Sequence, residues 1–492
     1  MYYPNFKKFL TYAQNGNLIP VVKDLILDCE TPVSVFLKVS DRERSSFLLE
    51  SVEYGEKIGR YSFIGHSPDI VVTKDNGKVS VRSKKDKIRA ERDADPLRTL
   101  EEITKRYSYV PVPNVPLFCG GFVGYCAYEN IASFEDIDLC TKRSLGFPQA
   151  IFFFSKELIV FDHLDKKVKI VVLAHVEDNK RRAYDFAVKR VNALETIIKR
   201  SRLPKKKPVS AALNRTLKSN ISRQEFEKGV RKIKSYIKAG DAIQVVLSQR
   251  FDLGPIENGF NVYRALRTVN PSPYMFYFKH KDTCLIGSSP EMLVKKEGSD
   301  VQVRPIAGTR KRGRTLREDE RLAQELVADE KENAEHLMLV DLGRNDLGRV
   351  CEYASISVTD YARVERYSHV MHLVSEVHGR LKRTSNVFDL LRFTFPAGTL
   401  TGAPKIRAMQ IIDEIEPDER GPYGGCLGYF SLSGDCDMCI TIRTIMIKDG
   451  HAYLQAGAGI VYDSVPSREY TETINKARAL MQADDVARND IH

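Results

Sequence analysis

Tryptophan is absent from the 492-residue sequence, and long hydrophobic runs are absent as well. No apolar stretch approaches the roughly 20 residues that a membrane-spanning helix needs, and the first residues lack the apolar core of a signal peptide. We therefore expect a soluble, cytoplasmic protein with no membrane partner.

Cysteine is present but forms no recognisable framework. The nine cysteines are scattered, and the lone C-x-x-C pair, Cys436 and Cys439, has neither a second pair nor nearby histidines. This distribution disfavours a zinc site and a disulfide scaffold, and it is typical of proteins in a reducing compartment.

Positive charge is in excess. The 76 Lys and Arg against 65 Asp and Glu give a formal net charge of +11, with short basic clusters at residues 84–87, 200–207 and 310–317. A nucleic-acid-binding protein is one alternative, but such proteins usually present an unbroken basic face with interleaved aromatic residues. We therefore expect solvated loops and no nucleic-acid partner. A positive cleft would also attract a dicarboxylate substrate.

The length predicts two or three domains, and the composition changes near residue 200. Residues 1–198 are rich in strand patterns, including a hairpin at 70–82 whose Asn76-Gly77 turn favours positive φ, and they end in a polar helix over 177–198. Residues 199–221 are basic, contain two prolines and form the predicted linker.

The second part of the chain, residues 222–492, opens with a predicted helix. Ser222 and Glu225 form a capping box at its start, and Gly240 marks its end. A buried strand follows over residues 242–249 and carries one polar residue, Gln244. Strands and helices do not alternate regularly, so the predicted fold class is α+β, with sheets packed between helices.

The stretch Arg304–Thr309 predicts a strand end that turns through Gly308. There the backbone N–H groups and the Thr309 hydroxyl could meet an anion at close range.

Two pairs of glutamates lie three residues apart on predicted helices: Glu332 with Glu335, and Glu469 with Glu472. This spacing places each pair on one helix face, where carboxylates could hold a hard cation such as Mg²⁺. From the spacing alone, solvated surface glutamates are the simpler interpretation.

Seven stretches resemble, in order and in spacing, the chorismate-utilising enzymes and within them the anthranilate synthase component I family: residues 305–309, 341–346, 368–372, 395–405, 420–425, 437–443 and 455–461. The resemblance implies a layered α/β/β/α sandwich of largely antiparallel sheets, with a chorismate-binding catalytic domain at 222–492 and a smaller regulatory domain at 1–198. It also implies a lyase of tryptophan biosynthesis that converts chorismate and ammonia to anthranilate and pyruvate. Aminodeoxychorismate synthase component I is the nearest alternative.

The resemblance assigns catalytic roles. Glu291 matches the general acid that protonates the departing C4 hydroxyl. His372 matches the base that removes the C2 proton, although its apolar neighbours alone would favour a core histidine. Gln244 and Ala307 stand where related enzymes carry a lysine that activates water or attacks the substrate. Because neither residue is basic or nucleophilic, free ammonia is implied.

The remaining matched positions imply ligand contacts. Glu335 and Glu472 would bind Mg²⁺ directly, with Glu332 and Glu469 behind them. Tyr423 and Arg443 would hold the enolpyruvyl carboxylate, and Lys476 would face the ring carboxylate. The full set of residues lining the substrate would be Thr399, Gly308, Thr309, Tyr423, Arg443, Gly457, Ala458, Gly459 and Lys476.

Two further segments resemble the family's site for L-tryptophan as a feedback inhibitor. Glu50 and Ser51 would engage the amino-acid head group, and Pro273, Tyr274 and Met275 would form the apolar wall. Without the resemblance, the same segments would be a strand core and a turn.

Cys426 lies in a G-x-C-x-G stretch like that of a glutaminase nucleophile. No suitable histidine follows it, so we expect a packing residue. A separate glutamine amidotransferase subunit would then supply the ammonia, in a heterotetramer with this chain.

Overall fold

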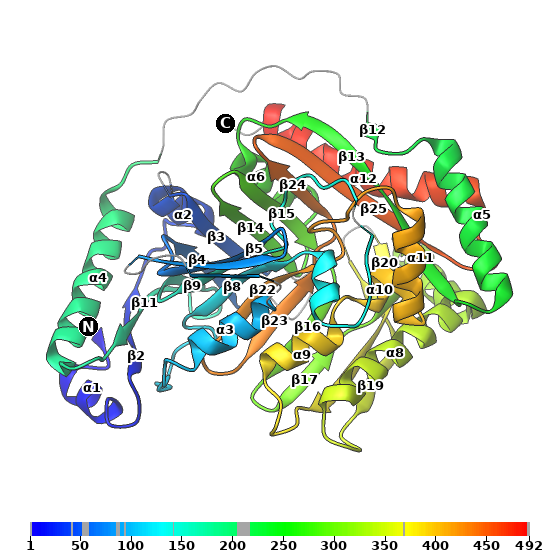
Figure 1. Ribbon diagram of the computed structural model, residues 1–492. Helices are drawn as coiled ribbons and strands as arrows, with labels where there is room; N and C mark the ends of the chain where they lie inside the picture. The colour runs from blue at the N-terminus through cyan, green and yellow to red at the C-terminus, as the bar shows by residue number, and fades with distance from the viewer. Residues whose placement is uncertain are drawn as a thin grey trace.

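Two large β-sheets form the centre of the molecule, and helices cover them (Figure 1). The computed structural model describes residues 2–40, 43–51, 59–84, 89–92, 95–140, 142–203, 217–367 and 370–489. Neighbouring strands in both sheets pair antiparallel. The fold is therefore α+β with two packed sheets between helices, as predicted.

The first sheet runs, in spatial order, through β1 (Tyr2–Tyr3), β2 (Leu18–Leu25), β11 (Lys167–His175), β10 (Glu157–Asp162), β4 (Tyr61–His66), β3 (Ser45–Glu50), β14 (Tyr274–His280), β15 (Thr283–Ser289), β24 (Thr444–Lys448), β25 (His451–Ile460), β13 (Gln244–Pro255) and β12 (Lys218–Ser219), with β21 (Gly402–Ala403) beside β13.

The second sheet runs through β18 (Ile306–Lys311), β20 (Val370–Arg380), β17 (Asp300–Val303), β16 (Met292–Glu297), β23 (Cys436–Ile440), β22 (Cys426–Ser431), β8 (Gly121–Cys126), β9 (Ala150–Ser155), β5 (Ile70–Asp75), β6 (Lys78–Ser83) and β7 (Arg89–Arg92), with β19 (Ser357–Arg366) beside β20.

The helices fall into three groups by the strands they cover. The first sheet packs against α1 (Phe6–Tyr12), α2 (Pro32–Ser40), α4 (Lys180–Arg200), α6 (Gly259–Val269) and α12 (Pro466–Asn489). Its β13 edge packs against α5 (Arg223–Ala239) and α11 (Lys405–Ile415). The second sheet packs against α3 (Pro96–Thr104), α7 (Leu316–Ala328), α8 (Glu330–Val350) and α9 (Val387–Thr394). Two short helical segments, η1 (Tyr128–Ser133) and α10 (Gly398–Thr401), lie in connections.

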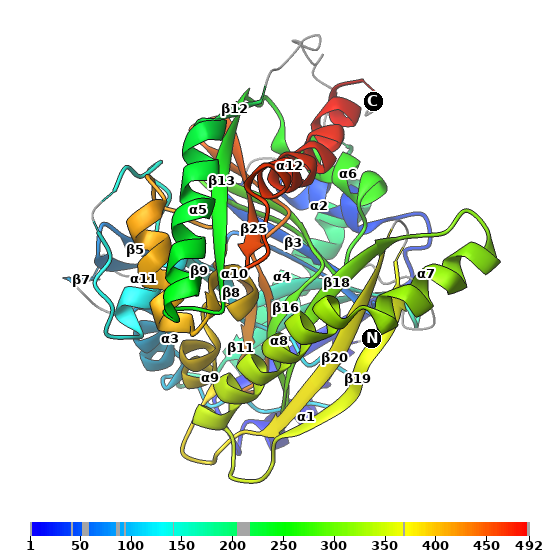
Figure 2. The same cartoon turned by 90° about the vertical axis from the view of Figure 1, so that its right-hand side faces the viewer.

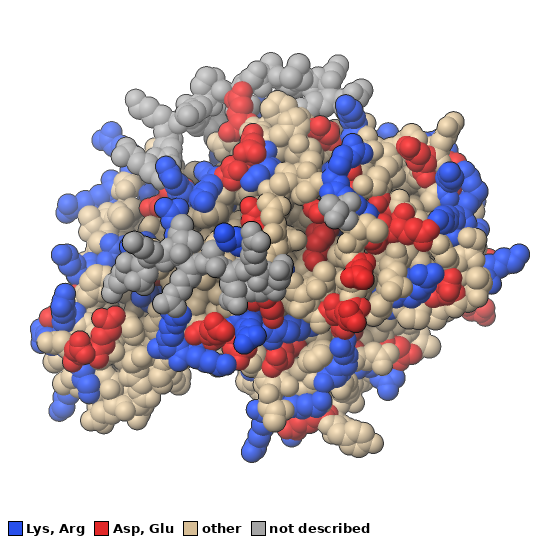
Figure 3. Space-filling view, viewed as in Figure 1, with Lys and Arg blue, Asp and Glu red and all other residues tan. Residues whose placement is uncertain are grey.

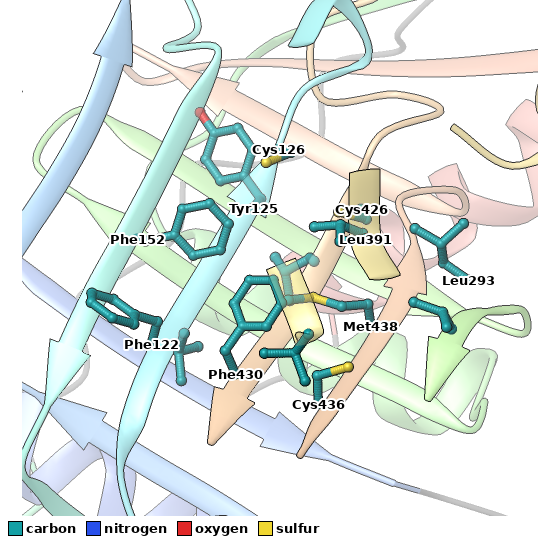
Figure 4. Close-up of a cluster of buried hydrophobic side chains, with 14 of the residues drawn as sticks. Phe122, Tyr125, Cys126, Phe152, Leu293, Leu391, Cys426, Phe430, Cys436 and Met438 are labelled. Carbon is teal, nitrogen blue, oxygen red and sulfur yellow. The ribbon is translucent and has the colours of Figure 1, made fainter. Parts of the chain in front are cut away.

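Aromatic side chains fill the space between the sheets. The rings of Phe153 on β9 and Phe278 on β14 stack with centroids 4.5 Å apart, which joins the second sheet to the first. Figure 4 shows a neighbouring part of this core, which includes Phe122, Tyr125, Phe152, Leu293, Leu391, Phe430 and Met438. Burial of these large apolar side chains is the main force that holds the two sheets together.

Local sequence signals produced the expected elements. The Asn76-Gly77 turn has positive φ at both residues and joins β5 to β6. The Ser222–Glu225 capping box starts α5, and Gly240 ends it with a left-handed φ of 87°. Of the predicted linker 199–221, residues 204–216 lie outside the described residues, as do the basic residues 85–87.

Both sheets combine strands from the two halves of the chain. In the first sheet, β3 pairs with β14, and in the second sheet β8 pairs with β22.

None of the described helices is long and apolar enough to cross a membrane. On the face shown in Figure 3, acidic and basic side chains are interspersed.

Candidate active site

The predicted site residues meet where the chain passes from one sheet to the other. Glu291 lies between β15 of the first sheet and β16 of the second, and Arg443 lies between β23 of the second and β24 of the first. Figure 2 looks onto this side of the molecule, where α8 and α12 lie near β25 and β18. Segments 224 residues apart thus contribute to one region, since Thr473 on α12 bonds to Gln249 on β13, the strand that begins at Gln244.

Glu291 is a buried carboxyl with only 9% of its surface exposed. Burial raises the pKa of this carboxyl to about 7, and the neighbouring Thr399 hydroxyl and Lys476 ammonium offset part of the shift. A carboxyl with such a pKa is about half protonated at neutral pH, so it can donate a proton there.

His372, on β20, is half-buried rather than sealed in the core. Its Nδ1 lies 2.8 Å from the Gly308 carbonyl oxygen and 3.1 Å from the Thr309 hydroxyl. Because a carbonyl can only accept, Nδ1 must carry the hydrogen, which leaves Nε2 as the proton acceptor. Burial also lowers the pKa of His372, so the ring is neutral at pH 7 and able to act as a base.

Gly308 does not end a strand, as the sequence suggested, but lies in a bulge within β18. The pairing with β20 shifts between Ala307 and Arg310, and Gly308 has φ of 62°. A local pattern could not distinguish the two cases, because the bulge depends on the register with β20. The bulge directs the Gly308 carbonyl to His372, while Ala307 pairs with the next residue, Leu373.

Glycines on β25 make room for two polar side chains. A Cβ atom at Gly457 would lie 2.8 Å from the Tyr423 hydroxyl, and one at Gly459 would lie 2.7 Å from Gln244 Nε2. Both distances are shorter than real Cβ contacts, so a larger residue at either position would force the facing Tyr423 or Gln244 side chain to move. The side chain of Ala458 between them points into the apolar core behind the strand, which leaves only its backbone toward the site.

Gln244 Oε1 is a buried polar atom at the site with no hydrogen-bond partner in the part of the chain that the structure describes. Buried polar atoms are normally paired, so this oxygen is suited to contact a ligand. Burial also lowers the pKa of the nearby Arg443, and its guanidinium lies close to Tyr423 and Glu472. Arg443 donates to the Lys476 carbonyl at 3.4 Å.

The glutamates of α8 and α12 are brought together across the site. Burial raises the pKa of Glu335, and the charges of Glu332 and Glu469 raise it further, while Lys331 opposes the shift. Burial likewise raises the pKa of Glu469, with a further contribution from Glu472. Carboxylates that repel one another in this way are suited to share a cation.

Three of the four glutamates form ion pairs with basic side chains. Glu332 lies 3.1 Å from Arg310, Glu335 lies 3.7 Å from Lys331, and Glu472 lies 2.6 Å from Lys476, which also donates to the Gly457 carbonyl at 2.9 Å. Among the described residues, no group of three or more side chains is gathered closely enough to hold a metal ion. The oxygen donors fit Mg²⁺ chemically, and a bound ion would compete with these basic partners.

Comparison with known proteins decides the family. The family model for chorismate-binding enzymes matches residues 44–482. The chain belongs to the chorismate-binding enzyme family. It is 48% identical to an anthranilate synthase component 1 from Acetivibrio thermocellus, with 99% of each chain covered, and 44% identical to one from Aquifex aeolicus, with 96% of each covered.

Solved structures agree on the fold. An anthranilate synthase component I from Streptococcus pneumoniae has a TM-score of 0.76 and 36% identity to this chorismate-binding enzyme, covering 93% of this chain and 98% of the other. The isochorismate synthase MenF from Escherichia coli has a TM-score of 0.70 at 19% identity, covering 97% of this chain and 98% of its own, and therefore shows the fold alone.

A second cavity, of about 470 Å³, has neither Glu291 nor His372 in its lining in this chorismate-binding enzyme. Its lining includes all of the residues expected around an inhibitor: Glu50, Ser51, Pro273, Tyr274 and Met275. The Glu50 carboxylate is already bound to Arg267 at 2.8 Å and to the Tyr263 hydroxyl at 2.5 Å. Tyr274 donates to Asp437 at 2.9 Å.

The cavity adjoins the catalytic region. Pro290 and Met292, on either side of Glu291, line it. A smaller cavity of about 50 Å³, lined by Glu291 and Thr399 among others, shares Met292 and Arg304 with the large one.

Some residues of the site could not be assigned from the sequence. Arg310, which pairs with Glu332, was expected only in a solvated loop, and Lys331, which pairs with Glu335, had no expected role. Arg420 lay within a matched motif but received no role, and its contacts form only through the tertiary fold. Cys426, by contrast, is fully buried in the core between the sheets, as a packing residue should be.

Proposed function

We propose that this chorismate-binding enzyme is the aminating subunit of an anthranilate synthase, which converts chorismate and ammonia to anthranilate and pyruvate in tryptophan biosynthesis. The main support is the set of chemical groups at the site. Glu291 is buried and can hold a proton at neutral pH, whereas Gln244 and Ala307 are neither basic nor nucleophilic. A site that has an acid but no nucleophile of its own requires one from outside, and the near-full-length relatives named anthranilate synthase support ammonia.

In the first step, Glu291 donates its proton to the C4 hydroxyl, which leaves as water while ammonia adds at C2. The ammonium group formed at C2 then gives up one proton to solvent, and Glu291 takes one back. In the second step, His372 Nε2 takes the C2 proton, the bond from ring carbon to enolpyruvyl oxygen breaks, and the ring becomes aromatic. The released enolpyruvate takes up a proton to give pyruvate. Tyr423 and Arg443 hold the enolpyruvyl carboxylate, and Gly457 leaves room for the Tyr423 hydroxyl.

Mg²⁺ is part of the proposal, held by Glu335 and Glu472 with Glu332 and Glu469 behind them. The bound ion would draw electron density from the ring carboxylate and make the ring easier to attack. We expect Glu335→Gln and Glu472→Gln to abolish Mg²⁺ binding measured by calorimetry, whereas Glu330→Gln on the exposed side of α8 should leave it intact. Unchanged Mg²⁺ affinity in both site variants would contradict this assignment.

The ammonia would come from a separate glutamine amidotransferase subunit in a heterotetramer, because Cys426 is fully buried and has no catalytic histidine beside it. L-tryptophan would bind the 470 Å³ cavity as a feedback inhibitor.

The test is an assay of the isolated chain with chorismate, Mg²⁺ and ammonium at mildly alkaline pH. We expect fluorescent anthranilate and stoichiometric pyruvate, with no product from glutamine alone. An aminated intermediate that accumulates without pyruvate would instead identify an aminodeoxychorismate synthase. No consumption of chorismate would refute the proposal.

A further inference from the structure

Arg420 is a buried arginine that bonds to three separate elements. Its exposed fraction is 3%, and its Nε and Nη2 donate to the two Glu416 carboxylate oxygens at 2.8 and 2.7 Å. Nη1 donates to the Leu400 carbonyl at 2.7 Å, and Nη2 also donates to the Val246 carbonyl at 2.9 Å. A planar guanidinium can satisfy all of these acceptors at once, which an ammonium cannot.

Two of these elements, α10 and β13, carry part of the proposed site. Leu400 follows Thr399 on α10, and Val246 follows Gln244 on β13 by two residues. Glu416 extends the network, because its Oε1 also accepts from the Ser248 backbone N–H and hydroxyl, both at 2.8 Å. Ser248 is the strand partner of Gly457.

The loop after Arg420 carries Tyr423, and it is fixed from both sides. The guanidinium of Arg420 lies 4.6 Å from the centroid of the Tyr128 ring and 5.8 Å from that of Tyr423. The Arg420 backbone N–H donates to Glu129 Oε1 at 2.7 Å, and the Tyr128 N–H donates to the Gly421 carbonyl at 2.8 Å. Buried charges paired in this way are costly to separate, so the arrangement is rigid.

We propose that Arg420 is a positioning residue, which with Glu416 fixes the Tyr423 loop relative to α10 and β13 so that the chorismate carboxylate meets a preformed contact. This inference rests on the proposed function. Arg420 acts through Tyr423, because its own guanidinium is already engaged by Glu416, Leu400 and Val246. Its effect therefore falls on chorismate binding and not on ammonia.

The test compares wild type, Arg420→Lys, Tyr423→Phe and the double variant by steady-state kinetics of anthranilate formation. We expect Arg420→Lys to raise the chorismate KM by about 10- to 100-fold, with the ammonium KM changed by less than about twofold. Because Arg420 acts through Tyr423, adding Tyr423→Phe should raise the chorismate KM by a much smaller factor in the Arg420→Lys background than in wild type.

Arg392→Lys is the matched control, since Arg392 forms ion pairs with Asp95 at 2.6 Å and Asp389 at 2.8 Å away from the site. It should lower Tm without changing either KM. If Arg420→Lys does not fold, Glu416→Gln takes its place and should give the same selective rise in chorismate KM. Unchanged constants in a folded variant, or additive effects with Tyr423→Phe, would overturn the inference. A wild-type chain that forms no anthranilate would refute the proposed function instead.

Discussion

The pKa values of Glu291 and His372 shift in opposite directions for one shared reason. Burial disfavours the charged form of both groups, so it raises the pKa of the carboxyl to about 7 and lowers the pKa of the imidazole. At pH 7 the carboxyl is therefore about half protonated, whereas the imidazole is mostly neutral. This division of roles comes from the environment of the residues and not from their types.

Replacing the acid should separate chemistry from binding. We expect Glu291→Gln to lower kcat by about 10²- to 10⁴-fold with little change in the chorismate KM, because the amide keeps the shape but has no proton to give. Steady-state kinetics would measure both constants. Glu297→Gln, at the exposed end of β16, is the control and should retain wild-type kcat. Retained kcat in Glu291→Gln would exclude this residue as the acid.

The dependence on pH follows from the same carboxyl. The protonated form is the active one, so kcat/KM for chorismate should fall as pH rises through about 7, when measured at a constant concentration of unprotonated ammonia. At low pH, protonation of His372 should reduce activity only below its ordinary pKa of about 6.5, because the pKa of this ring is lowered. A profile that keeps rising above pH 8 at constant ammonia would disagree with the assigned acid.

Residue identities at the site could be predicted from the motifs, but their pairings could not. The sequence gives no sign that Lys476 bonds both Glu472 and the Gly457 carbonyl, or that Gly459 makes room for Gln244. These contacts join residues from different elements, and their distances are set only when the sheets and helices pack.

At the scale of elements, the bulge in β18 links the strand to the chemistry. A Cβ atom at Gly308 would lie 3.0 Å from Leu326 and 3.2 Å from Glu332 Oε2, and the φ of 62° is unfavourable for any other residue. We expect Gly308→Ala to lower stability by about 1–2 kcal/mol and also to reduce activity, because the bulge holds His372.

Gly298→Ala is the matched control for this change. Gly298 has nearly the same φ, 60°, but a Cβ atom there meets nothing within 4 Å. Chemical denaturation should therefore show a similar loss of stability, while kcat stays at the wild-type value. Equal activities in the two variants would indicate that the bulge has no part in catalysis.

The proposed binding of L-tryptophan in the 470 Å³ cavity can be tested by a substitution at Ser51, just after β3. Ser51 lines the cavity next to Glu50, and a Cβ atom at Gly59 would already lie 2.4 Å from the Ser51 Cβ. A phenyl ring at position 51 therefore has to enter the cavity. We expect Ser51→Phe to abolish inhibition by L-tryptophan while ammonia-dependent activity persists, in an inhibitor titration with Ser80→Phe on β6 as the control. Undiminished inhibition would place the inhibitor elsewhere.

Elements with local determinants were the ones that sequence could predict. The cap of α5 depends on Ser222 and Glu225 alone, and the β5–β6 turn on Asn76 and Gly77. The bulge at Gly308 is different because it exists only relative to β20, whose matching residues are more than 60 positions away. The order of the strands within each sheet likewise could not be predicted from local sequence patterns, since β8 pairs with β22 about 300 residues later.

For the whole molecule, the shared sheets make the two halves depend on each other. A chain of residues 222–492 would lose β3 and β8, exposing the edges of β14 and β22, and it would also lack Tyr128 and Glu129 behind the Tyr423 loop. We expect this segment to aggregate or to be inactive. Circular dichroism and the anthranilate assay would measure this, with the full chain as reference. A soluble, fully active segment would contradict it.

Met292 and Arg304 belong to the walls of both cavities, so a substitution at either position changes both pockets at once. A mutation at either position that blunts an inhibitor also reshapes the space beside the acid, and selection acts on both effects together. Engineering of inhibitor-resistant variants should therefore begin at Leu117 and Phe118, which line the larger cavity but not the smaller one.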